Sequence, residues 1–174
     1  KELGTAPMTL YYHVRDKDEL LLLVMEEQAR ALPRPELPGD PRDRFVAVAT
    51  LLYEELSKRL WIVEVLTAED LVAPAAMWFV EAMIDAAIEY GHTPDRAVHI
   101  YRSVWFYIVG SLIIRARSAR RAGRQVHQDE VIGALPEDTH PRLAAVAGRW
   151  AELNARDMHR EALAAIIDGL LRAR

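Results

Sequence analysis

Helical periodicity between proline and glycine breaks is the feature that most constrains how this 174-residue chain can fold. Within each segment between the breaks, apolar residues recur at intervals of three and four, which places them on one face of an α-helix. No segment alternates β-branched and polar residues as a strand would, and no hairpin dipeptide is flanked by such segments. The sequence therefore predicts an all-α fold.

Caps and breaks predict where the helices begin and end. Asp16, with Glu19 three residues later, forms a capping box that starts a Leu-rich helix running to about Leu32. The segment after Arg120 is expected to be polar and irregular as far as Pro141. Further helices are expected from Pro41 onward and over Ile62–Thr67, Pro74–Tyr90, Pro94–Arg120, Pro141–Leu153 and Asp157–Arg172.

The segment from Pro33 to Pro41 is the clearest candidate for a domain boundary. It holds four prolines and one glycine in nine residues, a density that interrupts any regular element. The chain is therefore predicted to divide there, into residues 1–34 and residues 40–174.

Composition and charge exclude several classes of protein. The chain has no cysteine, which excludes disulfides, thiolate metal sites and thiol nucleophiles. Its net charge of −4 argues against a general polyanion binder. No segment has the layout of a signal peptide, and the longest apolar run, residues 104–114, is about half the roughly 20 residues that a membrane span needs. We therefore expect a cytoplasmic protein that does not interact with a membrane.

No motif for catalysis or cofactor binding is present. The sequence holds no nucleophile elbow, zinc-protease motif, P-loop or dinucleotide fingerprint. Glu54 and Glu55 are adjacent, so both are interpreted as solvated surface rather than as a catalytic pair. We expect a protein that is not an enzyme and has no metal or cofactor. Four polar residues after the long helix match no metal-ligand spacing: His127, Asp129, Asp138 and His140.

Hydroxyl, phenol and imidazole side chains crowd the first predicted helix. Thr9, Tyr12 and His13 share one face, and such groups suit hydrogen bonding to phosphate oxygens. Residues 6–8 lie at the helix start, where a recognition helix presents small and apolar groups to base edges. Lys17 adds a charge beside helix amides that favour phosphate. The pattern predicts contact with double-stranded DNA, and a surface helix whose tyrosines cover the core is the alternative that the residues leave open.

The stretch LGTAPMTLYYHVRDKDELL, residues 3–21, resembles the helix-turn-helix of the tetracycline-repressor (TetR) family of transcriptional regulators. Residues 9–13 match the recognition helix of that family, and residues 17–21 match the start of its fourth helix. The rest of the chain resembles the all-helical C-terminal domain of the family. GHTPDRAVHIYRSVWFYIVGSLI looks like the eighth helix, and HPRLAAV and EALAAIIDGLL resemble the last two.

The resemblance implies a role for each of the two predicted domains. Residues 1–34 would hold the remainder of a DNA-binding domain, and residues 40–174 would form a ligand-binding and dimerisation domain. Two departures from the family pattern are present: Ala6 stands where members often have a capping Ser, and the first helix and most of the second are not in the chain. Operator contacts are implied at Ala6, Pro7, Met8, Thr9, Tyr11, Tyr12, His13 and Lys17.

Two helices are more apolar than the surface of a monomer would tolerate. Residues 98–114 are apolar almost all round the helix, which predicts burial on two sides. The last helix carries a continuous stripe that includes Leu163, Ile167 and Leu170. We expect a homodimer through the helices over about residues 94–120 and 157–172. A central core helix in a monomeric bundle is the alternative.

Aromatic residues are concentrated in the helices between Leu51 and Ile113. A cavity among them would favour a flat or bulky apolar ligand with few polar anchors. The alternative is that the same aromatic residues only form the core. The candidate ligand-binding residues are Tyr53, Trp61, Glu64, Met77, Trp78, His99, Tyr101, Arg102 and Trp105.

These features and the resemblance predict a ligand-responsive transcriptional regulator that binds operator DNA as a homodimer, with repression as the expected mode. An apolar or aromatic small molecule is expected to release the DNA through a tilt of the helix over residues 16–32. The alternative is an all-α bundle or enzyme that binds a small molecule and has no role on DNA. The polar groups that hold the magnesium-chelated drug of the founding member have no counterpart in residues 60–74, so tetracycline is not predicted.

Overall fold

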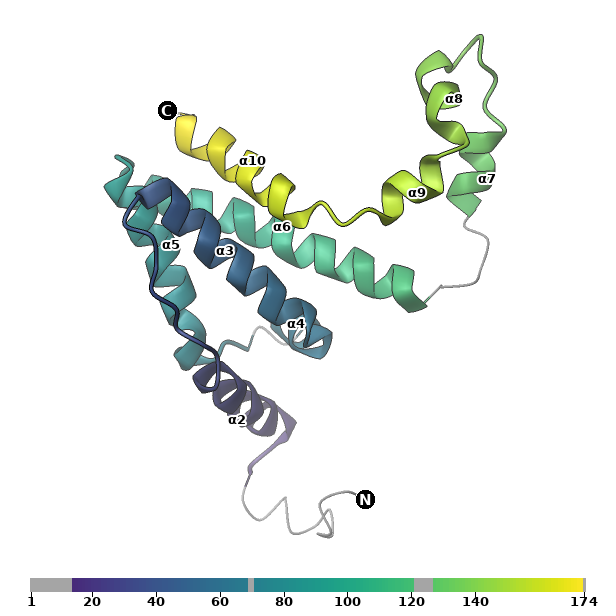
Figure 1. Ribbon diagram of the computed structural model, residues 1–174. Coiled ribbons are helices and arrows are strands. Elements are labelled where there is room, and N and C mark those ends of the chain that lie inside the picture. The colour runs from purple at the N-terminus through teal and green to yellow at the C-terminus, as the bar shows by residue number, and fades with distance from the viewer. Residues whose placement is uncertain (1–13, 69–70, 121–126, 174) are drawn as a thin grey trace. The chain divides into compact units, whose positions relative to one another are not determined.

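The computed structural model describes residues 14–68, 71–120 and 127–173. Over these ranges the chain forms nine α-helices, a single 3-10 turn η1 and no strand, so the predicted all-α class is confirmed. The elements are α2 (Lys17–Arg30), α3 (Pro41–Ser57), α4 (Leu60–Ala68), η1 (Pro74–Ala76), α5 (Met77–Glu89), α6 (Pro94–Arg120), α7 (His127–Gly133), α8 (Pro141–Ala147), α9 (Trp150–Ala155) and α10 (His159–Arg172), as Figure 1 shows.

Side-chain caps start α2 and α3 where the sequence predicts them. The Asp16 carboxylate accepts a hydrogen bond from the Glu19 amide at 2.8 Å, and the Glu19 carboxylate accepts one from the amide of Arg15. Asp40 caps α3 in the same way, accepting from the Asp43 amide at 2.9 Å. These bonds satisfy amides that have no partner within the first turn of a helix.

The described residues form two compact units, the first within residues 14–116 and 160–173 and the second within residues 117–159. In the first unit, side chains from α2, α3, α4, α5, α6 and α10 share one apolar core. Its largest fully buried side chains include Phe45, Phe79, Ile100, Ile108 and Leu163. Each comes from the apolar stripe of an amphipathic helix, and the burial of these stripes stabilises the unit.

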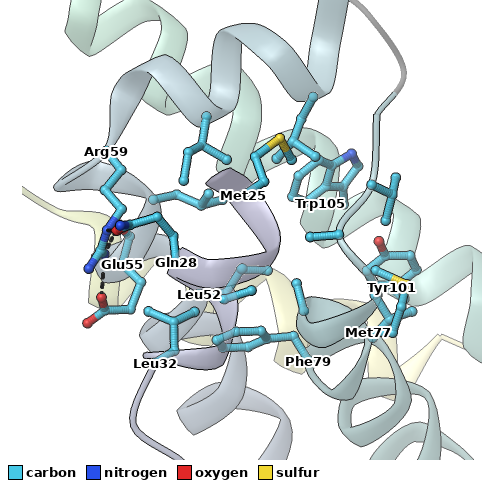
Figure 2. A pocket seen from close by; sticks show the side chains of 18 of the residues that line it. Met25, Gln28, Leu32, Leu52, Glu55, Arg59, Met77, Phe79, Tyr101 and Trp105 are labelled. Carbon is cyan, nitrogen blue, oxygen red and sulfur yellow. Dashed lines mark hydrogen bonds and ion pairs between the residues drawn. The ribbon is translucent and has the colours of Figure 1, made fainter. Parts of the chain in front are cut away.

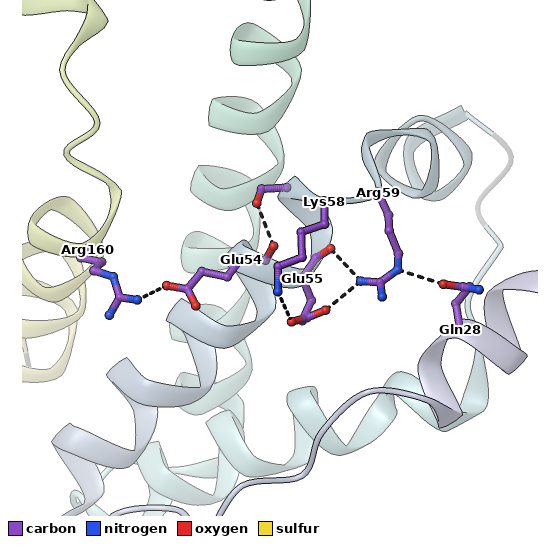
Figure 3. Close-up of polar contacts among 7 residues, drawn as sticks. Gln28, Glu54, Glu55, Lys58, Arg59 and Arg160 are labelled. Atoms are coloured by element: carbon purple, nitrogen blue, oxygen red, sulfur yellow. Dashed lines mark hydrogen bonds and ion pairs between the residues drawn. The ribbon is translucent and has the colours of Figure 1, made fainter.

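Ion pairs join α3 to α10 at both ends. Arg42, near the start of α3, donates from Nε to Asp168 at 2.8 Å and from Nη2 at 3.2 Å, which lowers the pKa of the Asp168 carboxyl. Arg160, near the start of α10, pairs with Glu54 near the end of α3 (Figure 3). Because each pair links the start of one helix to the end of the other, the two helices are antiparallel.

The long helix α6 buries one face and exposes the other. Ala97, Ile100 and Val104 lie on the buried face, whereas Phe106 and Ile114 on the other side are 59% and 67% exposed. The stretch Pro94–Ser118 is long and apolar enough to cross a membrane by length and composition alone, with mean hydropathy 1.4. The core helix of a globular protein can have the same length and hydropathy. The fully buried residues of α6 make this helix part of the core.

Several helix bounds differ from the sequence-based prediction. The segment Pro74–Tyr90 divides into η1 and α5, and the predicted helix over Pro141–Leu153 ends at Ala147 before α9 begins. Gly148 lies at this second break, where its low helix propensity favours an interruption. Helix α7 was not predicted, because seven residues with Ile132 as the buried one are too few for a periodic pattern.

We expect Gly91, the residue after the C-cap of α5, to be difficult to replace. Its φ is +115°, a conformation that costs L-residues with a Cβ about 1–2 kcal/mol, and the His92 amide bonds back to Ala87 across it at 3.1 Å. Gly91→Ala should therefore lower the free energy of unfolding by about 1–2 kcal/mol in urea titrations. Gly169→Ala, in open space inside α10, is the matched control and should raise it by about 0.5–1 kcal/mol. Equal effects of the two substitutions would contradict this assignment.

Candidate functional site

A cavity of about 480 Å³ lies within the first unit, among α2 to α6. The α2 side of the wall consists of Met25, Gln28, Ala29 and Leu32, which follow one another at helical spacing. The α5 and α6 side carries all the aromatic residues that line the cavity: Phe79, Tyr101, Trp105 and Phe106. The volume lies within the range of small-molecule sites, which are typically concave and largely apolar.

The aromatic end of the cavity is built by Met77 of α5 and by Tyr101 and Trp105 of α6 (Figure 2). Tyr101 and Trp105 are one helical turn apart, so both project from the same face of α6. Burial raises the pKa of the Tyr101 phenol, which therefore stays protonated at neutral pH and can donate a hydrogen bond. This end can hold a flat aromatic molecule and offer it one hydroxyl group.

The polar end of the cavity is built by Gln28, Glu55 and Arg59 (Figure 2). Glu55 is buried, at 8% exposure, and was wrongly interpreted from the sequence as solvated surface. Its carboxylate accepts hydrogen bonds from Lys58 and from Arg59, each at 2.7 Å (Figure 3). The bond from Lys58, and after it the bond from Arg59, lowers the pKa of Glu55 against the opposing effect of burial, which raises it. The carboxyl is therefore ionised at neutral pH.

Four of the nine predicted ligand-binding residues line this cavity: Met77, Tyr101, Arg102 and Trp105. The other five lie elsewhere. Tyr53 is buried in the core with its hydroxyl 3.4 Å from Arg115, and the half-buried Trp78 stacks on Phe79 with ring centroids 3.9 Å apart. The remaining three are exposed: Trp61, Glu64 and His99.

Sequence reasoning missed the lining residues of α2 and the polar end. Two signals could have found them. Met25, Gln28, Ala29 and Leu32 form an i, i+3, i+4, i+7 face that includes one polar residue. Glu55 and Arg59 are four residues apart, and helical spacing places them on the same face as Leu52 and Leu56. A charged pair therefore interrupts an apolar stripe at the end of α3.

Most of the predicted DNA contacts lie outside the described residues: Ala6, Pro7, Met8, Thr9, Tyr11, Tyr12 and His13. Lys17 is described, and it is exposed in the first turn of α2. The predicted operator contacts therefore remain predictions. The predicted division of the chain into residues 1–34 and 40–174 is also still a prediction.

A family model matches most of the chain. Residues 33–174 match the model of the tetracyclin repressor-like C-terminal domain. The HTH-type transcriptional repressor DrrR1 of Streptomyces coeruleorubidus is 29% identical over 128 residues, which cover 70% of this chain. The match spans 47% of that relative, about half its length.

Solved structures share the fold. The TetR family protein ActR of Streptomyces coelicolor, in complex with actinorhodin, has a TM-score of 0.71 at 24% identity, covering 98% of this chain and 83% of ActR. A second Streptomyces coelicolor transcriptional regulator, a TetR, has a TM-score of 0.66 at 18% identity, covering 98% of this chain and 84% of its own. At these identities the likeness establishes the fold alone.

We expect Glu55→Gln to destabilise the protein in a pH-dependent way. A carboxyl whose pKa is lowered by folding stabilises the folded state when ionised; this contribution is complete above the ordinary value of 4.5 and is lost as the pH falls through the folded pKa. The substitution should cost about 1–2 kcal/mol at pH 7 and progressively less below pH 4.5.

Urea titrations at a series of pH values measure this difference. Glu54→Gln is the matched control: Glu54 pairs with the exposed Arg160, and its loss should cost no more than about 0.5 kcal/mol. A cost for Glu55→Gln that does not change with pH would contradict the ion-pair explanation.

Proposed function

This chain belongs to the tetracycline-repressor family, and we propose that it is a ligand-responsive transcriptional repressor that binds operator DNA as a homodimer. The family is one of non-enzymatic transcription regulators, and the match to its C-terminal domain covers residues 33–174. This agrees with the sequence-based expectation of a protein that is not an enzyme. As a regulator of transcription it would act in the cytoplasm.

The observation that carries the proposal is that α2 forms one wall of the cavity. Helix α2 follows the predicted recognition segment directly in the sequence, and Met25, Gln28, Ala29 and Leu32 line the cavity. A molecule that fills the cavity must contact α2, and any difference in its affinity for two positions of α2 shifts the population between them. A change in α2 would in turn alter the spacing of two recognition helices on successive major grooves.

The cavity supports an aromatic effector. Trp105, Tyr101 and Phe106 offer ring faces, and Met77 is a flexible apolar side chain that adapts to an irregular ligand. ActR has been solved with actinorhodin, and we extend to this chain the role of binding a small molecule within this fold. The effector that we propose is flat and largely apolar.

The outer faces of α6 and α10 support the homodimer. Ile114 of α6 is exposed, and Ile166 and Leu170 of α10 are only half covered. Apolar side chains in this position are stabilised by pairing with the same helices of a second copy, which gives a four-helix interface about a twofold axis. Such a body would hold two recognition helices at a fixed spacing.

We expect the double substitution Tyr12→Ala and His13→Ala in the full-length protein to weaken operator binding by about 30-fold. This is the loss expected when two side-chain contacts to DNA phosphates are removed. The measurement is a binding titration on an operator selected from a random duplex library, repeated at several salt concentrations. Affinity should fall steeply with salt because phosphate contacts release counterions.

Sedimentation should find this variant still dimeric. Tyr90→Ala, at an exposed tyrosine of the first unit, is the matched control and should leave operator affinity unchanged. Unchanged operator affinity, or binding that does not depend on salt, would favour a small-molecule-binding bundle without a role on DNA.

We expect Trp105→Ala to weaken binding of 1,8-dihydroxyanthraquinone, a flat aromatic probe, by about tenfold, because a ring face of the cavity is lost. Operator affinity without the probe should stay within about twofold. Calorimetry and DNA titration measure the two effects separately. Trp150→Ala, in the second unit, is the matched control and should leave probe binding unchanged. Equal loss of probe and operator binding would identify Trp105 as a core residue instead.

A further inference from the structure

The charged groups of the cavity are divided between its two ends. Arg102 lies at the aromatic end, where it is exposed and its guanidinium carbon is 5.2 Å from the centre of the Phe106 ring. Glu55 and Arg59 lie together at the other end, beside Gln28 (Figure 2). Most of the remaining lining is aliphatic or aromatic, so these few groups decide which polar substituents a ligand can carry.

Arg59 holds two helices together through separate nitrogens. Its Nε donates to the Gln28 side-chain oxygen of α2 at 2.9 Å (Figure 3). Its Nη1 donates to the Glu55 carboxylate of α3 at 2.7 Å and to the Glu55 backbone oxygen at 3.3 Å. In the described part of the chain, Nη2 makes no hydrogen bond. The edge of the guanidinium formed by Nε and Nη2 is therefore occupied by a neutral amide alone.

This edge of a guanidinium fits a carboxylate. Elsewhere in the same unit, Arg42 uses its Nε and Nη2 on the two oxygens of Asp168, at 2.8 and 3.2 Å. Hydrogen bonds from a guanidinium to an ionised oxygen are roughly twice as strong as those to a neutral one. An anion that reached Arg59 would therefore displace Gln28 more readily than Glu55.

The local charge also favours an anion. Glu55 is neutralised from two sides, by Lys58 and by Arg59, so the three side chains together carry one net positive charge. Arg59 is only partly exposed, at 28% of its side chain, and solvent screening is weaker there than at the protein surface. A ligand with an apolar body and one acidic group would match both the apolar lining and this charge.

We propose that Arg59 is the subsite for an acidic group of the effector, and that binding this group takes Arg59 from Gln28 and so loosens α2. The proposal rests on the proposed function, because it assigns the chemistry of the effector at the same cavity. The acidic group is a carboxylate or an ionised phenol on an aromatic body. The Gln28–Arg59 bond acts together with the bond from the Ala75 amide to Glu26, at 2.8 Å, to hold α2 against the cavity.

A pair of probes of equal size tests the subsite. Anthraquinone-2-carboxylic acid is ionised at pH 7, whereas anthraquinone-2-carboxamide is neutral and nearly the same shape. Calorimetry with the chain should find the acid bound about tenfold more tightly than the amide, which is ~1.4 kcal/mol. In Arg59→Gln this preference should disappear through loss of affinity for the acid, while affinity for the amide stays within about threefold.

Two further variants are matched controls. Arg102→Gln removes the exposed cation of the cavity and should keep the preference for the acid, because that charge is already screened by water. Arg59→Lys keeps the charge without the planar fork and should keep only part of the preference, which also covers the case in which Arg59→Gln fails to fold.

The outcomes separate this proposal from the one on which it rests. Equal binding of both probes, or a preference that survives Arg59→Gln, overturns the subsite and leaves the aromatic effector in place. Failure of both probes to bind overturns the subsite together with the aromatic effector.

Hydrogen exchange tests whether Arg59 leaves Gln28. The acid, at saturation, should speed amide exchange in α2 by about fivefold, whereas the amide should leave it unchanged or slow it. Gln28→Leu should raise exchange in α2 without a probe, and the acid should then add little. Exchange in α2 that the bound acid does not alter would overturn the release step.

Discussion

The burial of one face of α6 is the constraint on which the rest of the first unit depends. Ala97, Ile100, Val104, Ile108 and Leu112 are all fully buried, so the helix supplies core residues along most of its length. Stripes from α3, α5 and α10 pack into the same core. Because this face holds α6 in place, the side chains beside it, Tyr101 and Trp105, can border a cavity instead of filling the core.

The α5 side of the cavity is anchored in the core, whereas the α2 side is held by two buried apolar residues and a few polar contacts. Phe79 of α5 is fully buried, and its neighbours anchor that side of the wall in the core. The α2 side is fixed by Met25 and Ala29 and by the polar contacts of Glu26 and Gln28. A buried carboxylate at the boundary, Glu55, is tolerated because two cations, Lys58 and Arg59, donate hydrogen bonds to its oxygens.

Sequence reasoning predicted the fold better than the site, for a physical reason. Period and caps are local, so Asp16 could be assigned as a cap, the start of α3 could be placed at Pro41, and α6 could be placed over roughly residues 94–120. Which aromatic residues face a cavity depends on how helices rotate against each other. Tyr53 turns into the core and Trp61 toward solvent, although both carry the same local signal as Trp105. Glu55 was misjudged because it was interpreted together with the adjacent Glu54, although Arg59, one helical turn later, is the partner that permits its burial.

The two ion pairs between α3 and α10 have a consequence for residues 117–159, the stretch that leads into α10: its length can change at little entropic cost. The chain leaves the first unit at residue 117 and returns to it at residue 160, and Arg160 and Asp168 then fasten the returning helix to α3. Entropy of closure grows only slowly with the length of such an excursion. Lengthening or shortening the stretch of residues 117–159 should therefore add little to the entropic cost of closing the chain back onto the first unit.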